Sequence, residues 1–245
     1  MKLVELKNIS KIYHTEKKEI KALDNISFDI NEGDFIAIVG PSGCGKSTIL
    51  SILSGLEDKT SGEIIKNNNL KFGFMFQQDT LFDWLTIEEN CLLGPKINKC
   101  IDNNIINYCN NLLKSYGLYE FKDSYPKELS GGMRQRVALI RTLVLNPDIL
   151  LLDEPFSALD AQTRLKISDD VYKIIKNEKK TTIMISHDVS ESVSMADIVI
   201  VLSDRPSKII NTYKIDYEKS TPIKNRLNPE FNLYCDKIWR DLNVL

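Results

Sequence analysis

A glycine-rich segment between a predicted strand and a predicted helix constrains the fold of this chain more than any other feature. Residues 40–48 read GPSGCGKST and match the pattern GxxxxGK[ST]. Residues 35–39 are apolar throughout, which is typical of a central strand covered on both faces. Residues 47–56 have helical periodicity and a glycine near their end. A buried strand, a tight turn and a helix in this order predict a parallel sheet with a ligand site at the carboxyl end of the strand.

The residue types in this segment suit a phosphate group. Glycines let backbone N–H groups approach phosphate oxygens without side-chain clashes, and the following helix directs the positive end of its dipole toward them. Lys46 supplies a positive charge for the β- and γ-phosphates, and the Ser47 hydroxyl can bind Mg²⁺. A glycine-rich turn without a ligand is the alternative, which the strand–turn–helix context disfavours. The predicted nucleotide-binding residues here are Gly40, Pro41, Ser42, Gly43, Cys44, Gly45, Lys46, Ser47 and Thr48.

Two carboxylates follow a second apolar run. Residues 149–155 read ILLLDEP, so Asp153 and Glu154 stand at the end of a predicted buried strand. Ligand sites in open α/β sheets lie at the carboxyl ends of strands. We therefore expect Asp153 to hold Mg²⁺ and Glu154 to polarise the water that attacks the γ-phosphate. An ordinary strand end capped by acidic residues is the alternative.

The remaining sequence alternates predicted strands and helices, which predicts a mostly parallel sheet with helices on both faces. The other predicted strands are residues 3–6, 26–30, 72–76, 181–185 and 198–202, with a charged loop at 14–21. Helical periodicity dominates the middle of the chain and recurs at 164–177. Beyond residue 207 the pattern weakens into a polar, lysine-rich tail with one predicted helix at 231–242.

These patterns define the expected domains. We expect an α/β domain over residues 1–206, with a helical subdomain at roughly 79–146 inserted in it, and a short extension at 207–245.

Bulk properties exclude several classes of protein. The 245 residues carry 32 Lys and Arg against 34 Asp and Glu, a net charge of −2, so no nucleic-acid footprint is expected. No apolar stretch reaches the roughly 18 residues of a membrane span, and residues 1–10 lack a signal-peptide core. The five cysteines are odd in number and have no CxxC spacing, which favours free thiols in a reducing compartment. We therefore expect this chain to stay in the cytosol.

A further motif gives the chain its resemblance to a known family. Residues 129–136 read LSGGMRQR and resemble the LSGGxxQR signature of ABC-transporter ATPases. Ser130, Gly131 and Gly132 would present a hydroxyl and N–H groups at the start of a helix, as a second anion cradle. The resemblance implies that these three residues and Gln135 bind the nucleotide. The resemblance implies a P-loop NTPase core with an N-terminal antiparallel β subdomain and an inserted α-helical subdomain. It also implies a head-to-tail homodimer, in which each ATP lies between the cradle of one copy and the signature of the other.

Other motifs of the family follow in order over residues 3–206. Gln77 resembles the Q-loop glutamine, which senses Mg²⁺ and the γ-phosphate, although Gln78 leaves a second register open. Residues 157–160 resemble the D-loop, and His187 resembles the switch histidine at the γ-phosphate. Tyr13 stands where the family stacks an aromatic ring on adenine. The resemblance implies catalytic roles for Glu154, His187, Gln77 and Lys46, and Mg²⁺ ligation by Ser47, Gln77 and Asp153.

Within the family, the chain most resembles importer subunits of the nitrate/sulfonate/taurine type. Residues 83–86, 153–164 and 202–206 carry this likeness. It implies separate transmembrane permease subunits, indirectly a solute-binding protein, and a peripheral position on the cytoplasmic face of the cell membrane. Besides Gln78, the sequence departs from the family pattern in a short segment at 61–76 and in Asp83 in place of proline. Trp84 suits a partner contact, with packing in the core of the inserted helical segment as the alternative.

The sequence leaves two other functions as alternatives. One is an ABC ATPase without a membrane partner. The types that act in translation or chromosome maintenance usually carry two cassettes or a long coiled coil, which this chain lacks. A cofactor-assembly ATPase of similar size is harder to exclude. The other is a nucleotide-binding regulator without catalysis, which the presence of both Glu154 and His187 disfavours.

Overall fold

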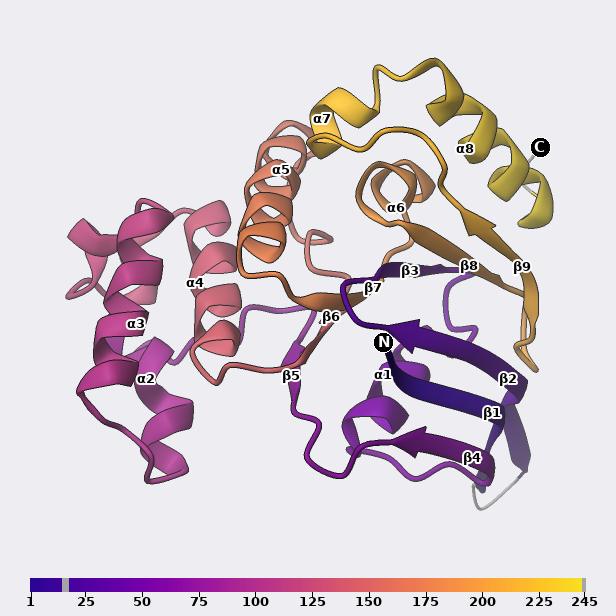
Figure 1. The fold of residues 1–245 in the computed structure, drawn as a ribbon, viewed down its shortest axis with the longest axis horizontal. Helices are drawn as coiled ribbons and strands as arrows, with labels where there is room; N and C mark the ends of the chain where they lie inside the picture. The colour runs from indigo at the N-terminus through magenta and orange to yellow at the C-terminus, as the bar shows by residue number, and fades with distance from the viewer. Residues whose placement is uncertain (15–17, 244–245) are drawn as a thin grey trace.

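The computed structural model describes residues 1–14 and 18–243, which form two sheets with helices packed around them (Figure 1). The larger sheet has six strands in the order β5-β6-β7-β3-β8-β9, all parallel except the antiparallel edge strand β9. This arrangement confirms the predicted fold class. The strands are β3 (Phe35–Val39), β5 (Phe72–Met75), β6 (Ile149–Asp153), β7 (Thr181–Ile185), β8 (Ile198–Leu202) and β9 (Ile209–Lys214).

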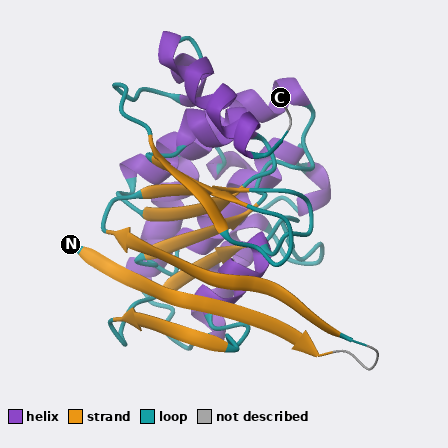
Figure 2. Cartoon of the chain, turned by 90° about the vertical axis from the view of Figure 1, so that its right-hand side faces the viewer, coloured by secondary structure: helices purple, strands orange, loops and turns teal. Residues whose placement is uncertain are grey.

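The smaller sheet is antiparallel and has the order β2-β1-β4. Strands β1 (Lys2–His14) and β2 (Glu19–Asn31) form the long hairpin that crosses the front of Figure 2, and β4 (Ser61–Lys66) pairs with β1. The predicted strands at 3–6 and 26–30 lie within these longer strands, near the start of β1 and the end of β2. The predicted loop at 14–21 is wrong at its ends, because His14 pairs with Glu19. Residues 15–17 of that prediction lie outside the described residues.

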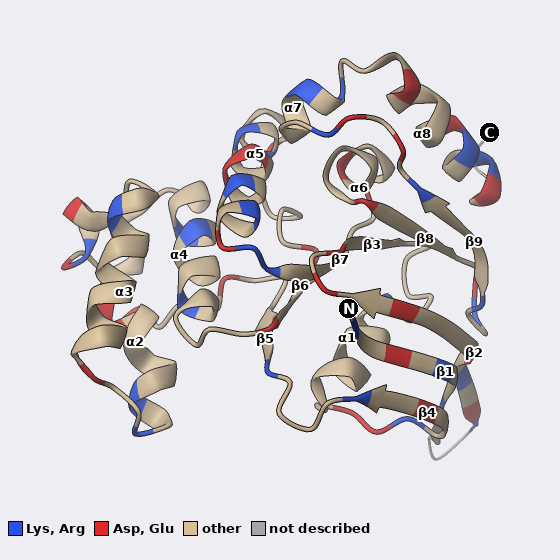
Figure 3. Ribbon diagram, viewed as in Figure 1, with Lys and Arg blue, Asp and Glu red and all other residues tan. Residues whose placement is uncertain are grey.

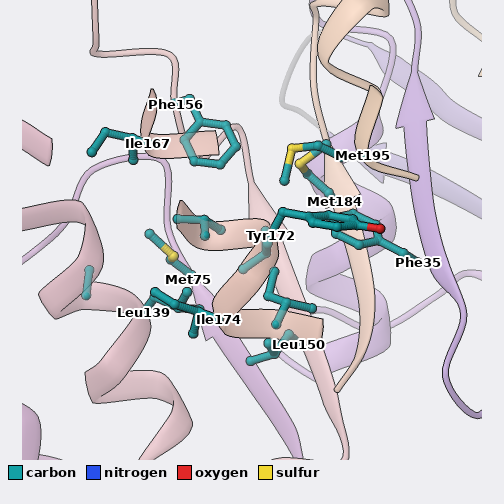
Figure 4. Close-up of a cluster of buried hydrophobic side chains, with 14 of the residues drawn as sticks. Phe35, Met75, Leu139, Leu150, Phe156, Ile167, Tyr172, Ile174, Met184 and Met195 are labelled. Atoms are coloured by element: carbon teal, nitrogen blue, oxygen red, sulfur yellow. The ribbon is translucent and has the colours of Figure 1, made fainter. Parts of the chain in front are cut away.

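Apolar side chains on the two faces of the large sheet form two cores. Along β3, Phe35, Ala37 and Val39 join one core, while Ile36 and Ile38 join the other. The first core, partly drawn in Figure 4, packs the sheet against α5 (Ala161–Asn177) and α6 (Val189–Met195). The second packs it against α1 (Lys46–Ser54) and the antiparallel sheet. Strands covered on both faces read as unbroken apolar runs, which is why the sequence revealed them.

A separate group of helices lies between β5 and β6 in sequence and at the left of Figure 1. It contains α2 (Ile87–Ile97), α3 (Asn103–Ser115) and α4 (Gly131–Leu143), with short 3₁₀ turns at Tyr119–Phe121 and Pro126–Glu128. Thr86 begins α2 with a capping box that involves Glu89, and Asp102 caps α3. Among the described helices, none is both long enough and apolar enough to cross a bilayer.

The C-terminal region contains more structure than the sequence predicted. Strand β9 pairs with β8, and the short helix α7 (Pro222–Asn225) precedes α8 (Pro229–Asp241). The prediction of a tail with a single helix is therefore wrong, because β9 is an edge strand with mostly exposed side chains and no apolar run. Both α5 and α8 contain acidic and basic residues (Figure 3).

Candidate functional site

The loop between β3 and α1 encloses a cavity of ≈ 280 Å³, lined by Ser42, Gly43, Gly45, Lys46, Ser47, Thr48 and Glu154. Gly43 and Gly45 have φ of 73° and 115°, in the left-handed region that favours glycine. A Cβ on Gly45 would also lie 2.9 Å from Leu23 Cδ2. Gly45 caps α1 without a side-chain hydrogen bond, so the first N–H groups of this helix face the loop. The loop is therefore shaped for an anion, and nucleotide binding by its residues stays a prediction.

Lys46 is buried in this loop with its ammonium group directed at the loop backbone. Its Nζ donates to Gly40 O at 2.9 Å and to Pro41 O at 3.0 Å. Carbonyl oxygens are neutral acceptors, so phosphate oxygens of a nucleotide would offer this cation stronger, charge-assisted bonds. Cys44 is buried beneath the loop, where its Sγ would lie 3.0 Å from a Cβ on Gly40. Gly40 and Cys44 thus shape the loop from below.

An oxygen pair suited to Mg²⁺ lies at the carboxyl end of β6. Ser47 Oγ donates to Asp153 Oδ1 at 3.1 Å, which joins the first turn of α1 to the acidic strand end. Burial raises the pKa of Asp153, and the nearby Glu154 acts in the same direction, while the Ser47 bond and Lys46 oppose them. Mg²⁺ prefers oxygen ligands and keeps waters and phosphate oxygens in its shell, so a hydroxyl and one carboxylate fit it.

Glu154 joins the ends of three neighbouring strands. Its Oε2 accepts from Gln77 Nε2 at 3.3 Å and lies 3.2 Å from His187 Nδ1. Gln77 follows β5 and His187 follows β7, which flank β6 in the sheet. The backbone turns sharply at Glu154, where φ is 45° and the N–H donates to Ile185 O at 3.0 Å. This turn directs the carboxylate toward both partners, although it follows Asp153 directly.

Sequence reasoning missed one side chain at this junction. Ser157 Oγ accepts from Gln77 Nε2 at 3.2 Å and donates to the carbonyl of Glu154 at 3.1 Å. Its place at the start of the D-loop motif was the signal that could have identified it. The side chain fixes the Gln77 amide between the ends of β5 and β6.

The signature segment begins helix α4. Ser130 caps this helix by accepting the N–H of Met133 at 3.4 Å, and both Ser130 and Gly131 are exposed. Gly132 is buried and packs against α5, so that a Cβ added to it would lie 2.5 Å from Ile167 Cδ1. Neither the serine nor the two glycines line the phosphate cavity of their own chain.

Gln135 differs from the expectation of a nucleotide contact. Its side chain is 6% exposed, and Nε2 donates to the carbonyl of Pro155. The structure therefore places this amide in a contact between α4 and the segment after Glu154. Gln135 lies five residues after Ser130, which turns it about 140° beyond one full turn of the helix and away from the exposed side.

Tyr13 lies at the end of β1, beside the phosphate loop. Its hydroxyl donates to Glu57 Oε2 at 2.6 Å and lies 3.2 Å from Thr48 Oγ1. Burial and the Glu57 bond raise the pKa of Tyr13. These contacts fix the ring next to the first turn of α1, where adenine stacking stays a prediction. His14 is exposed and lies 3.0 Å from Glu19 Oε1.

Known proteins resemble this chain over most of its length. A sequence model described as ABC transporter matches residues 23–157. An uncharacterized ABC transporter ATP-binding protein of Bacillus subtilis is 41% identical over 100% of this chain and 97% of its own length. The aliphatic sulfonates import ATP-binding protein SsuB of Bacillus anthracis is 39% identical over 96% of this chain and 94% of its own length.

A solved structure agrees with these relatives. The dimeric post-hydrolysis state of the ATP-binding cassette MJ0796, bound to ADP and Pi, superposes with a TM-score of 0.73 and 35% identity. The match covers 88% of this chain and 100% of that one. The chain therefore belongs to the ABC transporter family, as an ATP-binding and ATP-hydrolysing cassette.

Proposed function

We propose that this chain is the ATP-hydrolysing subunit of an importer and that it works as a head-to-tail dimer. The observation that carries the proposal is the exposure of Ser130 and Gly131, which form an anion cradle outside the phosphate cavity of their own chain. A second copy that turned its signature toward this cavity would complete the site. The dimeric assembly of the MJ0796 cassette supports this arrangement.

Each residue of the site has a proposed role. The N–H groups of residues 40–48 and the Lys46 ammonium bind the phosphates, while Ser47, Asp153 and Gln77 would hold Mg²⁺. When bound, Mg²⁺ neutralises charge on the β- and γ-phosphate oxygens. Glu154 orients the attacking water and accepts its proton, and His187, held 3.2 Å from Glu154, contacts the γ-phosphate. Loss of the γ-phosphate removes the link between the copies and lets them separate.

We infer a membrane partner from an exposed apolar surface near α2. Trp84 is 72% exposed, with its ring centroid 4.9 Å from that of Phe82. A groove of ≈ 450 Å³ next to them is lined mainly by Leu85, Leu92, Leu93, Ile97 and Ile101. Exposed aromatic residues beside an apolar groove suit an interface anchor, so we assign this surface to a permease subunit. The import function in the name of the SsuB relatives supports this assignment.

The proposed position in the cell and the proposed solute depend on this contact with a permease subunit. We place the chain on the cytoplasmic face of the membrane, with the solute chosen by the permease and a separate solute-binding protein. A small solute of the nitrate, sulfonate or taurine type fits the SsuB relatives. We retain residues 1–206 as the ATPase domain, with its helical subdomain at 79–146, and residues 207–245 as an extension, of which β9 belongs to the core sheet.

A Glu154→Gln variant tests the ATPase and the dimer together. We expect hydrolysis to slow by about 10²–10⁴ while ATP still binds, since the amide cannot accept the proton of water. Light scattering should then find a dimer with ATP and Mg²⁺ and a monomer without them. Wild-type turnover in this variant would show that Glu154 does not activate the attacking water. A variant that binds ATP and stays monomeric would refute a site shared between two copies.

Trp84→Ala tests the permease surface. We expect it to reduce co-purification with the membrane protein encoded next to this chain, because truncating an interface anchor costs about 2 kcal/mol or more. The matched control is Leu227→Ala, which removes another exposed apolar side chain, 81% exposed and located after α7. Equal capture of both variants would contradict the docking surface, and an ATPase without a membrane partner would then be the better assignment.

A further inference from the structure

A closed ring of hydrogen bonds holds the turn that carries His187. Asp188 caps α6 and accepts the N–H of Glu191 at 3.0 Å. In an ordinary capping box, the third helical residue would return its side chain to the N–H of the cap. Here Ser186 stands between them, since the Asp188 N–H donates to Ser186 Oγ at 3.0 Å and Ser186 Oγ donates to Glu191 Oε2. The ring therefore encloses His187, which lies between Ser186 and Asp188 in sequence.

Capping alone does not explain the burial of Glu191. Its side chain is 3% exposed, and its hydrogen-bond partner in the described structure is the Ser186 hydroxyl. Burying a carboxylate costs free energy unless charges and hydrogen bonds compensate for it. An exposed glutamate at the same helical position would cap α6 without that cost, as Glu89 does for α2. The buried position therefore calls for a reason beyond helix formation.

The position of the ring relative to the catalytic residues supplies this reason. Glu191, His187 and Glu154 line one narrow cleft together with Ser157. On the sheet side, the N–H of Ser186 donates to Ile38 O of β3 at 3.3 Å. On the helix side, Asp188 begins α6. The backbone of His187 is thus fixed at both ends, and its Nδ1 lies 3.2 Å from Glu154 Oε2.

We infer that Glu191 is a positioning residue for ATP hydrolysis, which acts through Ser186 to hold His187 against Glu154. The inference rests on the proposed function, because it needs His187 and Glu154 to act at the γ-phosphate. Glu191 lies behind His187 and has no assigned contact with the nucleotide. Errors of about 1 Å in the placement of a reacting group can cost on the order of 10² in rate. The gain in rate from a fixed turn can therefore offset the free energy lost by burying one carboxyl group.

The groups around Glu191 make its effect depend on pH. Glu154 faces it from the end of β6, Arg164 from α5, Asp188 from the start of α6 and Arg226 from the end of α7, with His187 on the cleft side. Burial raises the pKa of Glu191 to about 7, with the Ser186 bond opposing and Asp188 adding to the shift, while the two arginines oppose it.

The sign of the pH effect follows from the donors in the ring. The ionised carboxylate accepts the Ser186 hydroxyl, and the serine oxygen remains free to accept the Asp188 N–H. A protonated carboxyl carries its own O–H and competes with Asp188 for that oxygen. The contribution of the ring to kcat is therefore present above about pH 7 and is lost as the pH falls through the raised pKa of Glu191.

Two substitutions at Glu191 test the inference in the full-length chain. For Glu191→Ala we expect kcat to fall about tenfold with the KM for ATP changed by less than about twofold, because the loss falls on alignment rather than binding. Glu191→Gln keeps an acceptor for Ser186, so it should recover most of kcat. It should also lose the part of the acidic fall in kcat that Glu191 contributes. Steady-state ATPase activity from about pH 5.5 to about pH 8.5 measures both effects.

Further variants separate positioning from folding. Ser194→Ala removes another buried hydroxyl from α6, which donates to Glu191 O at 2.8 Å, and leaves the ring intact. It should lower the melting temperature and keep wild-type kcat. Ser186→Ala breaks the ring from the other side, so it should lower kcat as Glu191→Ala does. In the double variant the two substitutions together should lower kcat little more than either does alone.

Three results would overturn the inference. They are wild-type kcat in folded Glu191→Ala, a Glu191→Gln variant as slow as Glu191→Ala, and an acidic limb in Glu191→Gln identical to that of the wild type. Wild-type turnover of Glu154→Gln is a different failure, since it would overturn the proposed function whatever the Glu191 variants do.

Discussion

The phosphate loop and the signature segment are both glycine-containing starts of helices, yet the structure surrounds them differently. The phosphate loop has a buried lysine, a carboxylate at 3.1 Å from its serine and a cavity of ≈ 280 Å³. The signature presents Ser130 and Gly131 at the surface, while Gly132 and Gln135 are packed inside the chain. One element is nearly complete within a single copy, and the other lies exposed, outside the phosphate cavity of its own chain.

The position of a motif in the fold therefore decides how the motif can work. A helix N-terminus attracts anions wherever it lies, but it forms an enclosed site only with other groups around it. The phosphate loop obtains those groups from neighbouring strand ends. The signature must obtain them from another molecule, and the predictions below test this distinction.

Mixing two inactive variants is the strongest test. Lys46→Ala removes the cation of the phosphate loop, and Gly131→Asp places a negative charge at the signature, where two like charges about 4 Å apart repel by about 4 kcal/mol. Each variant alone should lose activity by about 10³ or more. In a mixed dimer one site has both mutations and the other has neither, so an equal mixture should recover about a quarter of wild-type activity.

The mixing experiment has an internal control. An aspartate in the first turn of α4 favours the helix dipole, and a Cβ on Gly131 would meet only the flexible Leu159 Cδ2 at 3.3 Å, so the variant should fold. A mixture that stays inactive, although both chains are folded and dimerise, would show that each copy completes its own site.

Much of the fold could be predicted because burial on both faces leaves a plain sequence signal. Strands β3, β6, β7 and β8 are short apolar runs, and each was predicted within one residue. Strand β9 was missed, since it is an edge strand whose side chains are mostly exposed and it lacks such a run. The length of β1 and β2 was underestimated because exposed polar residues interrupt the apolar pattern, at Lys7 and Asn8 in β1 and at Asn25 in β2.

The candidate site was predictable where chemistry lies in contiguous motifs or at strand ends. Gln77, Glu154 and His187 come together because β5, β6 and β7 are neighbours. The ring through Ser186 and Glu191 was not predictable, because nothing in the local sequence indicates that Glu191 is buried. The direction of the Gln135 side chain likewise depends on how α4 packs against the segment after Glu154.

Asp153→Asn addresses the metal side of the phosphate loop. We expect activity to fall by about 10²–10³, because the amide removes the one carboxylate assigned to Mg²⁺. Since burial raises the pKa of Asp153, protons should displace Mg²⁺ at a higher pH than at a solvated aspartate. Titrating Mg²⁺ into the ATPase assay at several pH values should reveal this competition in the wild type and its absence in Asp153→Asn. A wild-type Mg²⁺ affinity independent of pH would contradict the assignment.

Tyr13 tests whether the phosphate-loop side also binds the base within one copy. Stacking of a base on an aromatic ring is worth about 1–3 kcal/mol, so Tyr13→Ala should weaken ATP binding about tenfold, even in protein kept monomeric. Tyr13→Phe keeps the ring and removes only the bonds to Glu57 and Thr48, so it should bind ATP nearly as the wild type does. Calorimetric titration with ATP measures both affinities. Equal binding by the alanine variant would leave Tyr13 a packing residue of β1.

The smallest effects should come from adding a single methyl group to the signature glycines. A Cβ on Gly132 would lie 2.5 Å from Ile167 Cδ1, so Gly132→Ala should force α4 and α5 apart and lower the free energy of unfolding by about 1–3 kcal/mol. Gly131 is exposed and its φ lies outside the left-handed region, so Gly131→Ala should be neutral or slightly stabilising. Thermal unfolding should separate them by about 2–4 °C per kcal/mol in a chain of this size. Equal melting temperatures of the two variants would mean that neither glycine is needed for packing. Gly132 would then not be the buried residue of the signature that the structure shows.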